Sequence, residues 1–271
     1  MKLTKILSIV LFALSLGLVY YLYDSIHSTI LFRESITSTE KQITDKLAVI
    51  REAEKAYLEQ HGHYTANWDS LRNFIENGQV PITLRTEKIT PLSYGEEKVE
   101  VIVDTIGYMP AKDRIFKKNY NTNASANGLF YGFLTKVGDY VLKGSPAYRL
   151  KAEGRPKTEV YTFVEQGTIT SLANLKPGDQ ITKGQNIAAL WDYSLNPNVD
   201  LTNLGQVPGS NGKVFDIFVG KIDRNGSMVS VIEVKDPSPI NPERKASNEA
   251  KTRQPLRFGS RVDVNTTGNW E

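Results

Sequence analysis

The chain has 271 residues, enough for one moderate or two small domains beyond a long helix. Its 33 lysines and arginines nearly balance its 30 aspartates and glutamates, and no basic block is typical of nucleic-acid binding. The absence of cysteine excludes disulfides, cysteine-ligated metals and a lipid anchor on an N-terminal cysteine.

Residues 6–23 form an uncharged, mostly apolar run. At about 1.5 Å per residue this run approaches the ~30 Å thickness of a hydrocarbon core. Lys2 and Lys5 precede it and Asp24 follows it, which predicts that residues 1–5 form a cytoplasmic tip. The sequence therefore predicts a transmembrane helix at 6–23, a signal anchor in the inner (plasma) membrane. This single-pass topology would place the remainder of the chain in an extracytoplasmic, periplasmic location.

A cleaved signal peptide is the alternative interpretation of the same run. Residues 13–17 (ALSLG) are a poor small-residue cleavage site. The cluster of Tyr20, Tyr21 and Tyr23 is typical of the aromatic belt at a membrane interface, which favours retention of the segment.

The helix is expected to continue beyond the run, because neither glycine nor proline occurs between Gly17 and Gly62. A narrow apolar stripe marks it as amphipathic. The stripe consists of Ile36, Ile43, Leu47, Ile50 and Tyr57. A second, short helix follows, in which Trp68, Leu71 and Ile75 share one face. Residues 24–79 are thus predicted to form an extracytoplasmic helical region.

Four apolar residues of the long helix are candidates for a partner interface. They are Ile26, Ile30, Phe32 and Ile36. They precede the point where a compact domain beginning near residue 80 could cover the helix, so they would meet another subunit or a partner helix. The alternative is that they are scattered exposed apolar residues, which are ordinary on protein surfaces.

From residue 80 onward the signals indicate β structure. Residues 99–106 (VEVIVDTI) alternate β-branched with polar residues, which predicts a half-buried strand. Residues 214–222 and 227–234 flank Asn225-Gly226, a favoured pair for a tight hairpin turn.

A solvated loop is predicted at residues 235–254, which carry many charges, three prolines and a single large aliphatic residue. The fold class predicted for the whole chain is α+β. A transmembrane helix continuous with a long amphipathic helix would precede a mainly β, sandwich-like domain at residues 80–271.

An internal repeat lies within this β region. Residues 137–144 (VGDYVLKG) recur forty residues later as residues 177–184 (PGDQITKG). Glycine-aspartate, a β-branched residue and lysine-glycine predict a turn, a short strand and a second turn. Gly138 and Gly178 are therefore predicted to occupy equivalent structural turns of a pseudo-symmetric β-sandwich.

Three short motifs of the helical third follow one another closely. They are Ile50-Arg51-Glu52-Ala53-Glu54-Lys55-Ala56-Tyr57, Gly62-His63-Tyr64 and Trp68-Asp69-Ser70-Leu71. This region resembles type IV pilins and the pseudopilins of type II secretion, and it also resembles membrane-anchored proteins of the Bacteroidetes with a similar Gly-Asn-Trp-Glu ending. The resemblance implies a long helix packed on a β domain. The chain departs from pilins in having no glutamate in the apolar run.

The repeat resembles the two halves of a biotinyl/lipoyl-like domain. In carrier proteins of that family a lysine between the halves is modified, and Lys157 falls in this region, but its neighbours do not match the family motif. Periplasmic adaptors of export machines combine an N-terminal span with a lipoyl-like domain. They carry a helical hairpin between the halves, whereas no helix is predicted between Gly144 and Gly178.

No catalytic residues, metal site or cofactor are predicted. His61 and His63 lie at a helix end without further ligands, and no nucleophile elbow or phosphate-binding loop occurs. The sequence thus favours a non-enzymatic structural or assembly component, pilin- or pseudopilin-like, of an envelope or secretion-type protein complex. Its expected partners are the membrane and either further copies of itself or other subunits of a membrane complex, with no nucleic acid. An export-machine adaptor and a membrane-tethered hydrolase are the alternatives.

Overall fold

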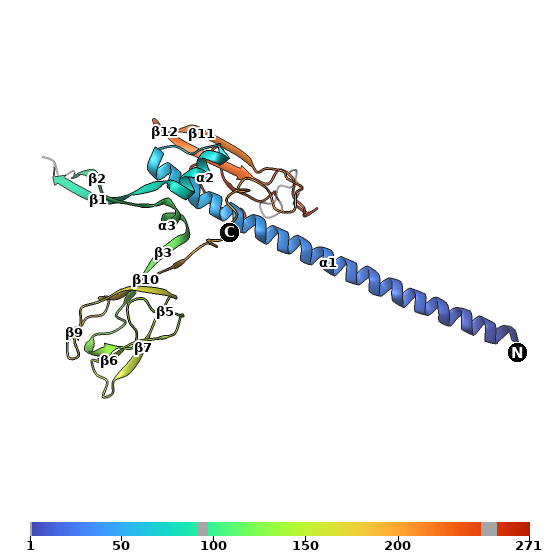
Figure 1. Ribbon diagram of the computed structural model, residues 1–271, viewed down its shortest axis with the longest axis horizontal. Helices are drawn as coiled ribbons and strands as arrows, with labels where there is room; N and C mark the ends of the chain where they lie inside the picture. Colours follow the sequence, from blue (N-terminus) through green and yellow to red (C-terminus); the bar gives the residue numbers. More distant parts are fainter. Residues whose placement is uncertain (1, 92–96, 245–253) are drawn as a thin grey trace. The chain divides into compact units, whose positions relative to one another are not determined.

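The computed structural model describes the backbone of residues 2–91, 97–244 and 254–271 (Figure 1). Its longest element is α1 (Lys2–His61), an unbroken helix that Gly62 ends in a left-handed conformation with φ of 74°. The predicted second helix is α2 (Trp68–Asn77), capped by the Asn67 side chain, which accepts the Ser70 N–H at 3.0 Å.

The described part of α1 corrects the membrane prediction. Among the residues that the structure describes, none of the helices combines the length and apolar character needed to cross a membrane. Tyr20, Tyr21, Tyr23 and Asp24 interrupt the apolar run and lower the mean hydropathy of the segment that follows Leu11. The predicted transmembrane helix at 6–23, the signal anchor and the single-pass inner-membrane location are therefore wrong. The extracytoplasmic location of the rest of the chain was inferred from that helix, so this prediction is wrong as well.

The chain divides into two compact units. The first unit comprises residues 1–51 and 203–271, and the second comprises residues 52–202. The region predicted as one β domain at 80–271 is thus shared between them. The predicted mainly β character of this region is confirmed.

The first unit combines the earlier part of α1 with a three-stranded antiparallel sheet in the order β11-β12-β13. The strands are β11 (Asp216–Arg224), β12 (Ser227–Lys235) and β13 (Arg257–Gly259). Asn225 and Gly226 join β11 to β12 with φ of 54° and 80°, as the hairpin prediction requires. The buried core of this unit includes Leu47 and Ile50 of α1 and Ile232, Val234 and Phe258 of the sheet.

The predicted solvated loop is described for residues 236–244. This part makes more contacts with the rest of the first unit than a solvated loop would. Asp236 is buried and accepts the Ser238 N–H at 2.9 Å. Arg244 donates to Glu40 of α1 at 2.5 Å. This half of the loop is therefore ordered by polar contacts rather than by apolar burial, which the composition does not reveal.

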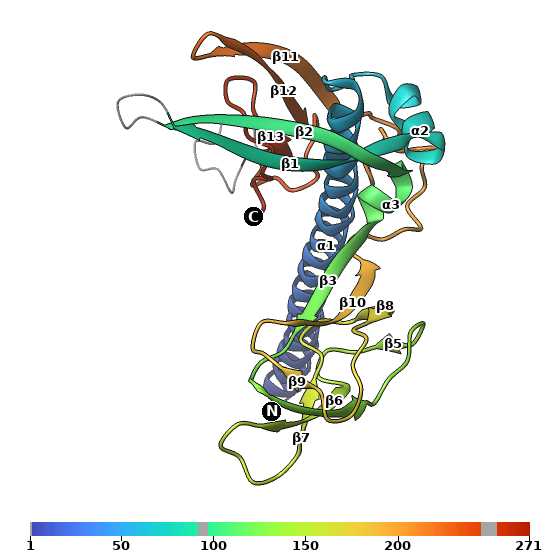
Figure 2. The ribbon, with the colours of Figure 1, turned by 90° about the vertical axis from the view of Figure 1, so that its left-hand side faces the viewer.

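The second unit begins with the end of α1 and α2, followed by a long antiparallel ribbon of two strands (Figure 2). The ribbon consists of β1 (Gln79–Pro91) and β2 (Glu97–Pro110). The short helix α3 (Ala111–Phe116) leads from it to β3 (Lys117–Asn123). Residues 99–106 do form part of a strand, but Val103 and Ile106 are 58% and 65% exposed, so the described side chains do not form the predicted half-buried pattern.

The rest of the second unit is a sandwich of two four-stranded sheets, in the orders β3-β10-β8-β5 and β7-β6-β4-β9. Its remaining strands are β4 (Gly128–Phe133), β5 (Tyr140–Val141), β6 (Pro146–Ala152), β7 (Glu159–Thr162), β8 (Gly167–Leu172), β9 (Gln180–Ile181) and β10 (Asn186–Tyr193). One continuous core fills the space between the sheets, with Phe130, Leu150, Phe163 and Leu190 among its fully buried members. The region between Gly144 and Gly178 contains strands and no helix.

The two sheets have equivalent strand orders. If β3, β4, β5 and β6 are exchanged with β7, β8, β9 and β10, respectively, the order of one sheet becomes the order of the other. The repeated residues occupy matching places: Gly138 has φ of 93° and donates its N–H to Ile169 O at 2.8 Å, whereas Gly178 has φ of 99° and donates to Phe130 O at 2.7 Å. The sandwich is therefore pseudo-symmetric, and both turns need the left-handed backbone that glycine adopts most readily.

Candidate functional site

The most unusual surface of the molecule is the exposed part of α1, here called the apolar helix surface. It comprises fourteen large apolar side chains that are each at least 47% exposed, namely Leu11, Phe12, Leu14, Leu16, Leu18, Val19, Tyr20, Tyr21, Leu22, Tyr23, Ile26, Ile30, Leu31 and Phe32. Because an α-helix has 3.6 residues per turn, these positions surround the helix rather than form one stripe. The predicted interface candidates Ile26, Ile30 and Phe32 belong to this surface.

The fourth candidate, Ile36, is only partly exposed. Together with Phe32 it lines a groove of about 500 Å³ between α1 and residues 241–243 in the first unit. Glu40 closes the groove, since its Oε1 accepts from Asn241 at 3.0 Å and from Arg244 at 2.5 Å. On the helix, Phe32 and Ile36 are the apolar part of the lining, beside Thr29, Arg33 and Thr37, and the polar rim is held in place by these hydrogen bonds.

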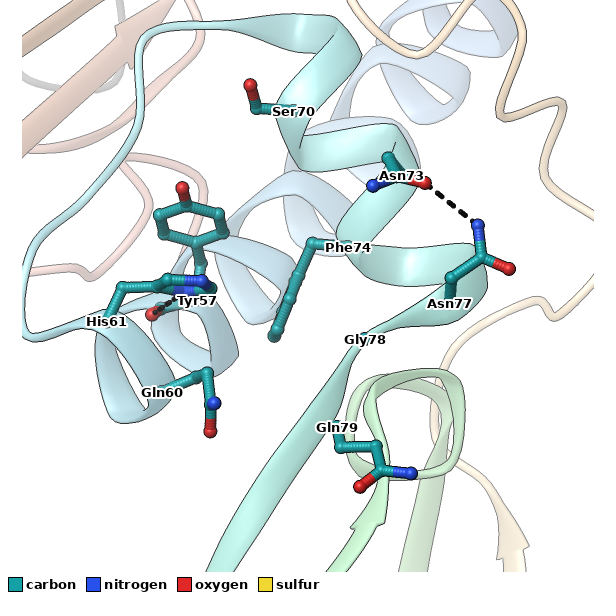
Figure 3. Close-up of a pocket in the computed structure, with 9 residues that line it drawn as sticks. All are labelled: Tyr57, Gln60, His61, Ser70, Asn73, Phe74, Asn77, Gly78 and Gln79. Carbon is teal, nitrogen blue, oxygen red and sulfur yellow. Dashed lines mark hydrogen bonds between the residues drawn. The ribbon is translucent and has the colours of Figure 1, made fainter.

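A second hollow lies at the junction of α1 and α2 in the second unit (Figure 3). It has a volume of about 360 Å³ and an aromatic wall. Tyr57 stacks on His61 with ring centroids 4.0 Å apart, and Phe74 meets Tyr57 edge-on at 5.2 Å. His61 is oriented by Nδ1, which lies 3.2 Å from the Tyr57 carbonyl oxygen.

Neutral polar side chains complete the lining of this hollow. They are Gln60, Ser70, Asn73, Asn77 and Gln79. Asn77 Nδ2 donates to Asn73 Oδ1 at 2.8 Å, which fixes the orientation of both amides (Figure 3). These side chains can offer hydrogen bonds to an uncharged polar group.

Glu54 is a buried carboxyl group near the end of α1. Its Oε2 accepts the Thr65 N–H at 3.0 Å, while Oε1 is buried without a hydrogen-bond partner in the described structure. Burial raises the pKa of Glu54 to about 8, against the opposing effect of the Thr65 hydrogen bond. Burial and the nearby Glu54 also raise the pKa of the Tyr64 hydroxyl. The Glu54 carboxyl therefore holds a proton at neutral pH and ties the helix end to the following loop.

Sequence reasoning overlooked Glu54, although a signal was present. Glu54 lies four residues after Ile50 and three before Tyr57, directly on the predicted apolar stripe. A lone acidic residue at such a position is a candidate for a buried, protonated carboxyl group. Phe74, Asn73 and Asn77 of the hollow were also overlooked, because the apolar spacing of the second helix points to Trp68, Leu71 and Ile75 instead.

Metal binding has no support in the described residues, where no group of three or more histidine or acidic side chains could hold an ion. His61 and His63 have ring centroids 6.2 Å apart and no acidic partner completes the pair. Lys157 is exposed in the loop between β6 and β7, which joins the two repeats. Arg155 of the same loop donates to Glu159, the first residue of β7, at 2.6 Å.

Comparison with known proteins adds little. No protein-family model matches the chain, and no curated protein matches it either. The urea carboxylase of Kluyveromyces lactis is similar over 27% of this chain and 6% of its own, with a TM-score of 0.25 and 20% identity. The product-bound ectoine utilization protein EutE (DoeB) from Ruegeria pomeroyi is similar over 28% of this chain and 21% of its own, with a TM-score of 0.22 and 23% identity. Similarity at this level carries no functional inference.

Proposed function

We propose that this chain is a non-enzymatic subunit of a larger protein assembly, in which α1 packs against the α1 helices of other copies. The observation that carries the proposal is the apolar helix surface. At about 100 Å² each, its fourteen side chains expose on the order of 1,400 Å², more than twice the largest apolar patch of ordinary monomers. A surface of this size lowers the free energy of association when it is covered.

The distribution of these side chains favours several neighbours over one. A two-helix seam needs a single narrow stripe, whereas residues such as Leu11, Phe12 and Leu14 point in widely different directions. A helix that is apolar all round is most stable at the centre of a bundle.

The groove beside Phe32 and Ile36 supports it further. These two side chains form the apolar part of the lining of a hollow whose rim is already fixed by Glu40, Asn241 and Arg244. Such a preformed groove suits the apolar face of a second helix, because little ordering is needed on binding.

The test is the double variant Phe32→Gln/Ile36→Gln of the full chain, studied by sedimentation velocity. We expect self-association to weaken by about tenfold or more, since two buried apolar contacts would be lost per interface. The matched control is Val262→Gln, which replaces an 84% exposed apolar residue outside α1 and should leave association unchanged.

Two results would contradict the proposal. A lower melting temperature with unchanged association would show that Phe32 and Ile36 stabilise only their own unit. Adsorption of the wild-type chain to phosphatidylcholine vesicles without any association between chains would show that a lipid surface covers α1 instead.

A further inference from the structure

The ribbon of β1 and β2 lacks the cover that a two-stranded sheet needs. Within the described residues no third strand pairs with it, and its main contacts with the remainder of the second unit are to α3 at its base. Two isolated strands are marginally stable in water, because one face of a pleated sheet must be buried to offset the cost of ordering it. Figure 2 shows the two strands running side by side along their length.

About half of its exposed side chains are apolar. Those at least 40% exposed are Ile82, Leu84, Val101, Ile102, Val103, Ile106 and Tyr108. A single exposed apolar residue needs no explanation, but this ribbon exposes apolar side chains on both of its faces, so neither face has the burial that normally stabilises a sheet.

The strand register assigns these residues to faces. Arg85 pairs with Val103 and Glu87 pairs with Val101, so these four side chains share one face, here called the valine face. On this face both charges lie on β1 and both valines lie on β2. The neighbouring pairs, Leu84 with Asp104 and Thr86 with Ile102, point to the other face.

We propose that the valine face packs on the valine face of a second copy of this chain. A two-fold axis perpendicular to the strands would stack β1 on β1 and β2 on β2, each pair running antiparallel. With the axis at the level of Thr86 and Ile102, Arg85 meets Glu87 of the second copy, and Val103 meets Val101. The Arg85–Glu87 ion pair and the Val103–Val101 contact each form twice by symmetry, so the face is complementary to itself.

The size of this contact defines its role. Residues 79–87 pair with residues 101–110, about nine per strand, so one face of this part of the ribbon measures about 30 Å by 10 Å, or roughly 300 Å² per copy. The total of about 600 Å² is below the ~1,200 Å² of an independently stable complex. The contact is therefore weak alone and adds to the association of α1, so this inference rests on the proposed function.

Charge reversal tests the pairing. Arg85→Glu alone and Glu87→Arg alone each place like charges together twice, and each should weaken self-association of the full chain by about tenfold in sedimentation velocity at low salt. Mixing the two variants should restore association, because each chain then supplies the charges that its partner lacks. The double variant should also restore it. Asp104→Lys, on the opposite face, is the matched control and should change association little.

Cross-linking supplies a second measurement, since the chain has no cysteine of its own. A mixture of Val101→Cys and Val103→Cys chains should give a mixed disulfide dimer under mild oxidation, whereas Ile102→Cys, on the opposite face, should not. Equal cross-linking at all three positions, or no restoration by mixed charges, would overturn the inference.

The two proposals fail separately. If Phe32→Gln/Ile36→Gln abolishes association and the charge reversals have no effect, the ribbon contact is wrong and the proposed function stands. If the mixed disulfide forms while the helix variant associates like the wild type, α1 is not the interface and the ribbon contact stands.

Discussion

Replacing Glu54 with glutamine should remove a penalty on stability that grows with pH. In the folded chain the pKa of Glu54 is about 8, against an ordinary value of 4.5. Between these two values the folded state keeps a proton that the unfolded state has released, so stability falls as pH rises. A pKa difference of about 3.5, at about 1.4 kcal/mol per pKa unit, corresponds to about 5 kcal/mol by pH 8.

Glutamine has nearly the shape of a protonated glutamate and keeps an oxygen that can accept the Thr65 N–H. The variant should therefore match the wild type near pH 4, where both forms are neutral, and exceed it by several kcal/mol at pH 8. Asp236, whose pKa burial also raises, is present in both chains and cancels in the comparison.

Urea unfolding of both chains at pH 4.5, 6 and 8 measures the difference. A variant without Glu76, Glu76→Gln, removes an exposed carboxylate of α2 and should show no such pH trend. A constant difference between Glu54→Gln and the wild type across these pH values would refute the reasoning. So would an NMR titration in which the Glu54 side-chain carbonyl changes near its ordinary pKa.

Three further predictions concern turns and buried charge. Alanine at Gly138 and at Gly178 should destabilise the second unit equally, by about 1 kcal/mol in urea unfolding, because both have positive φ and both face open space. Unequal effects would contradict the equivalence of the repeats. Alanine at Gly259 should lower the free energy of unfolding by at least about 3 kcal/mol, since its Cβ would overlap the Ile232 carbonyl oxygen and φ is positive there. A smaller drop in melting temperature for Gly259→Ala than for Gly138→Ala would count against this. Glu233→Gln should destabilise by about 1–3 kcal/mol in urea unfolding, because it weakens two arginine contacts to a buried carboxylate; an unchanged midpoint would refute it.

Local signals in the sequence predicted local structure well. The Asn225-Gly226 pair and the Gly-Asp repeats lie in turns, since a need for positive φ leaves a direct trace in residue choice. The end of the long helix at Gly62 has the same origin.

The burial of individual side chains was harder to predict, because it depends on which other segments of the chain pack against them. The alternation in residues 99–106 is correct for a strand but does not reveal whether anything packs on it. The order of residues 236–244 comes from contacts of Asn241 and Arg244 with Glu40, two hundred residues away in sequence. The aromatic wall at Tyr57 likewise depends on the packing of α2, and the face expected for that helix (Trp68, Leu71 and Ile75) does not include Phe74, whose ring meets Tyr57.

The interleaving of the two repeats in the sandwich has a consequence for how such a domain can arise. Each sheet takes two strands from each repeat, so a single repeat of about forty residues cannot complete either sheet. Expressed alone, it could build this fold only as an intertwined homodimer, whose formation would depend on concentration. The six-residue loop at 153–158 joins the two repeats covalently. Each repeat then meets the other at an effective concentration of the order of millimolar, which is set by the length of the loop and not by the concentration of the protein. Duplication followed by fusion would thus convert a conditional dimer into a domain that folds at any dilution.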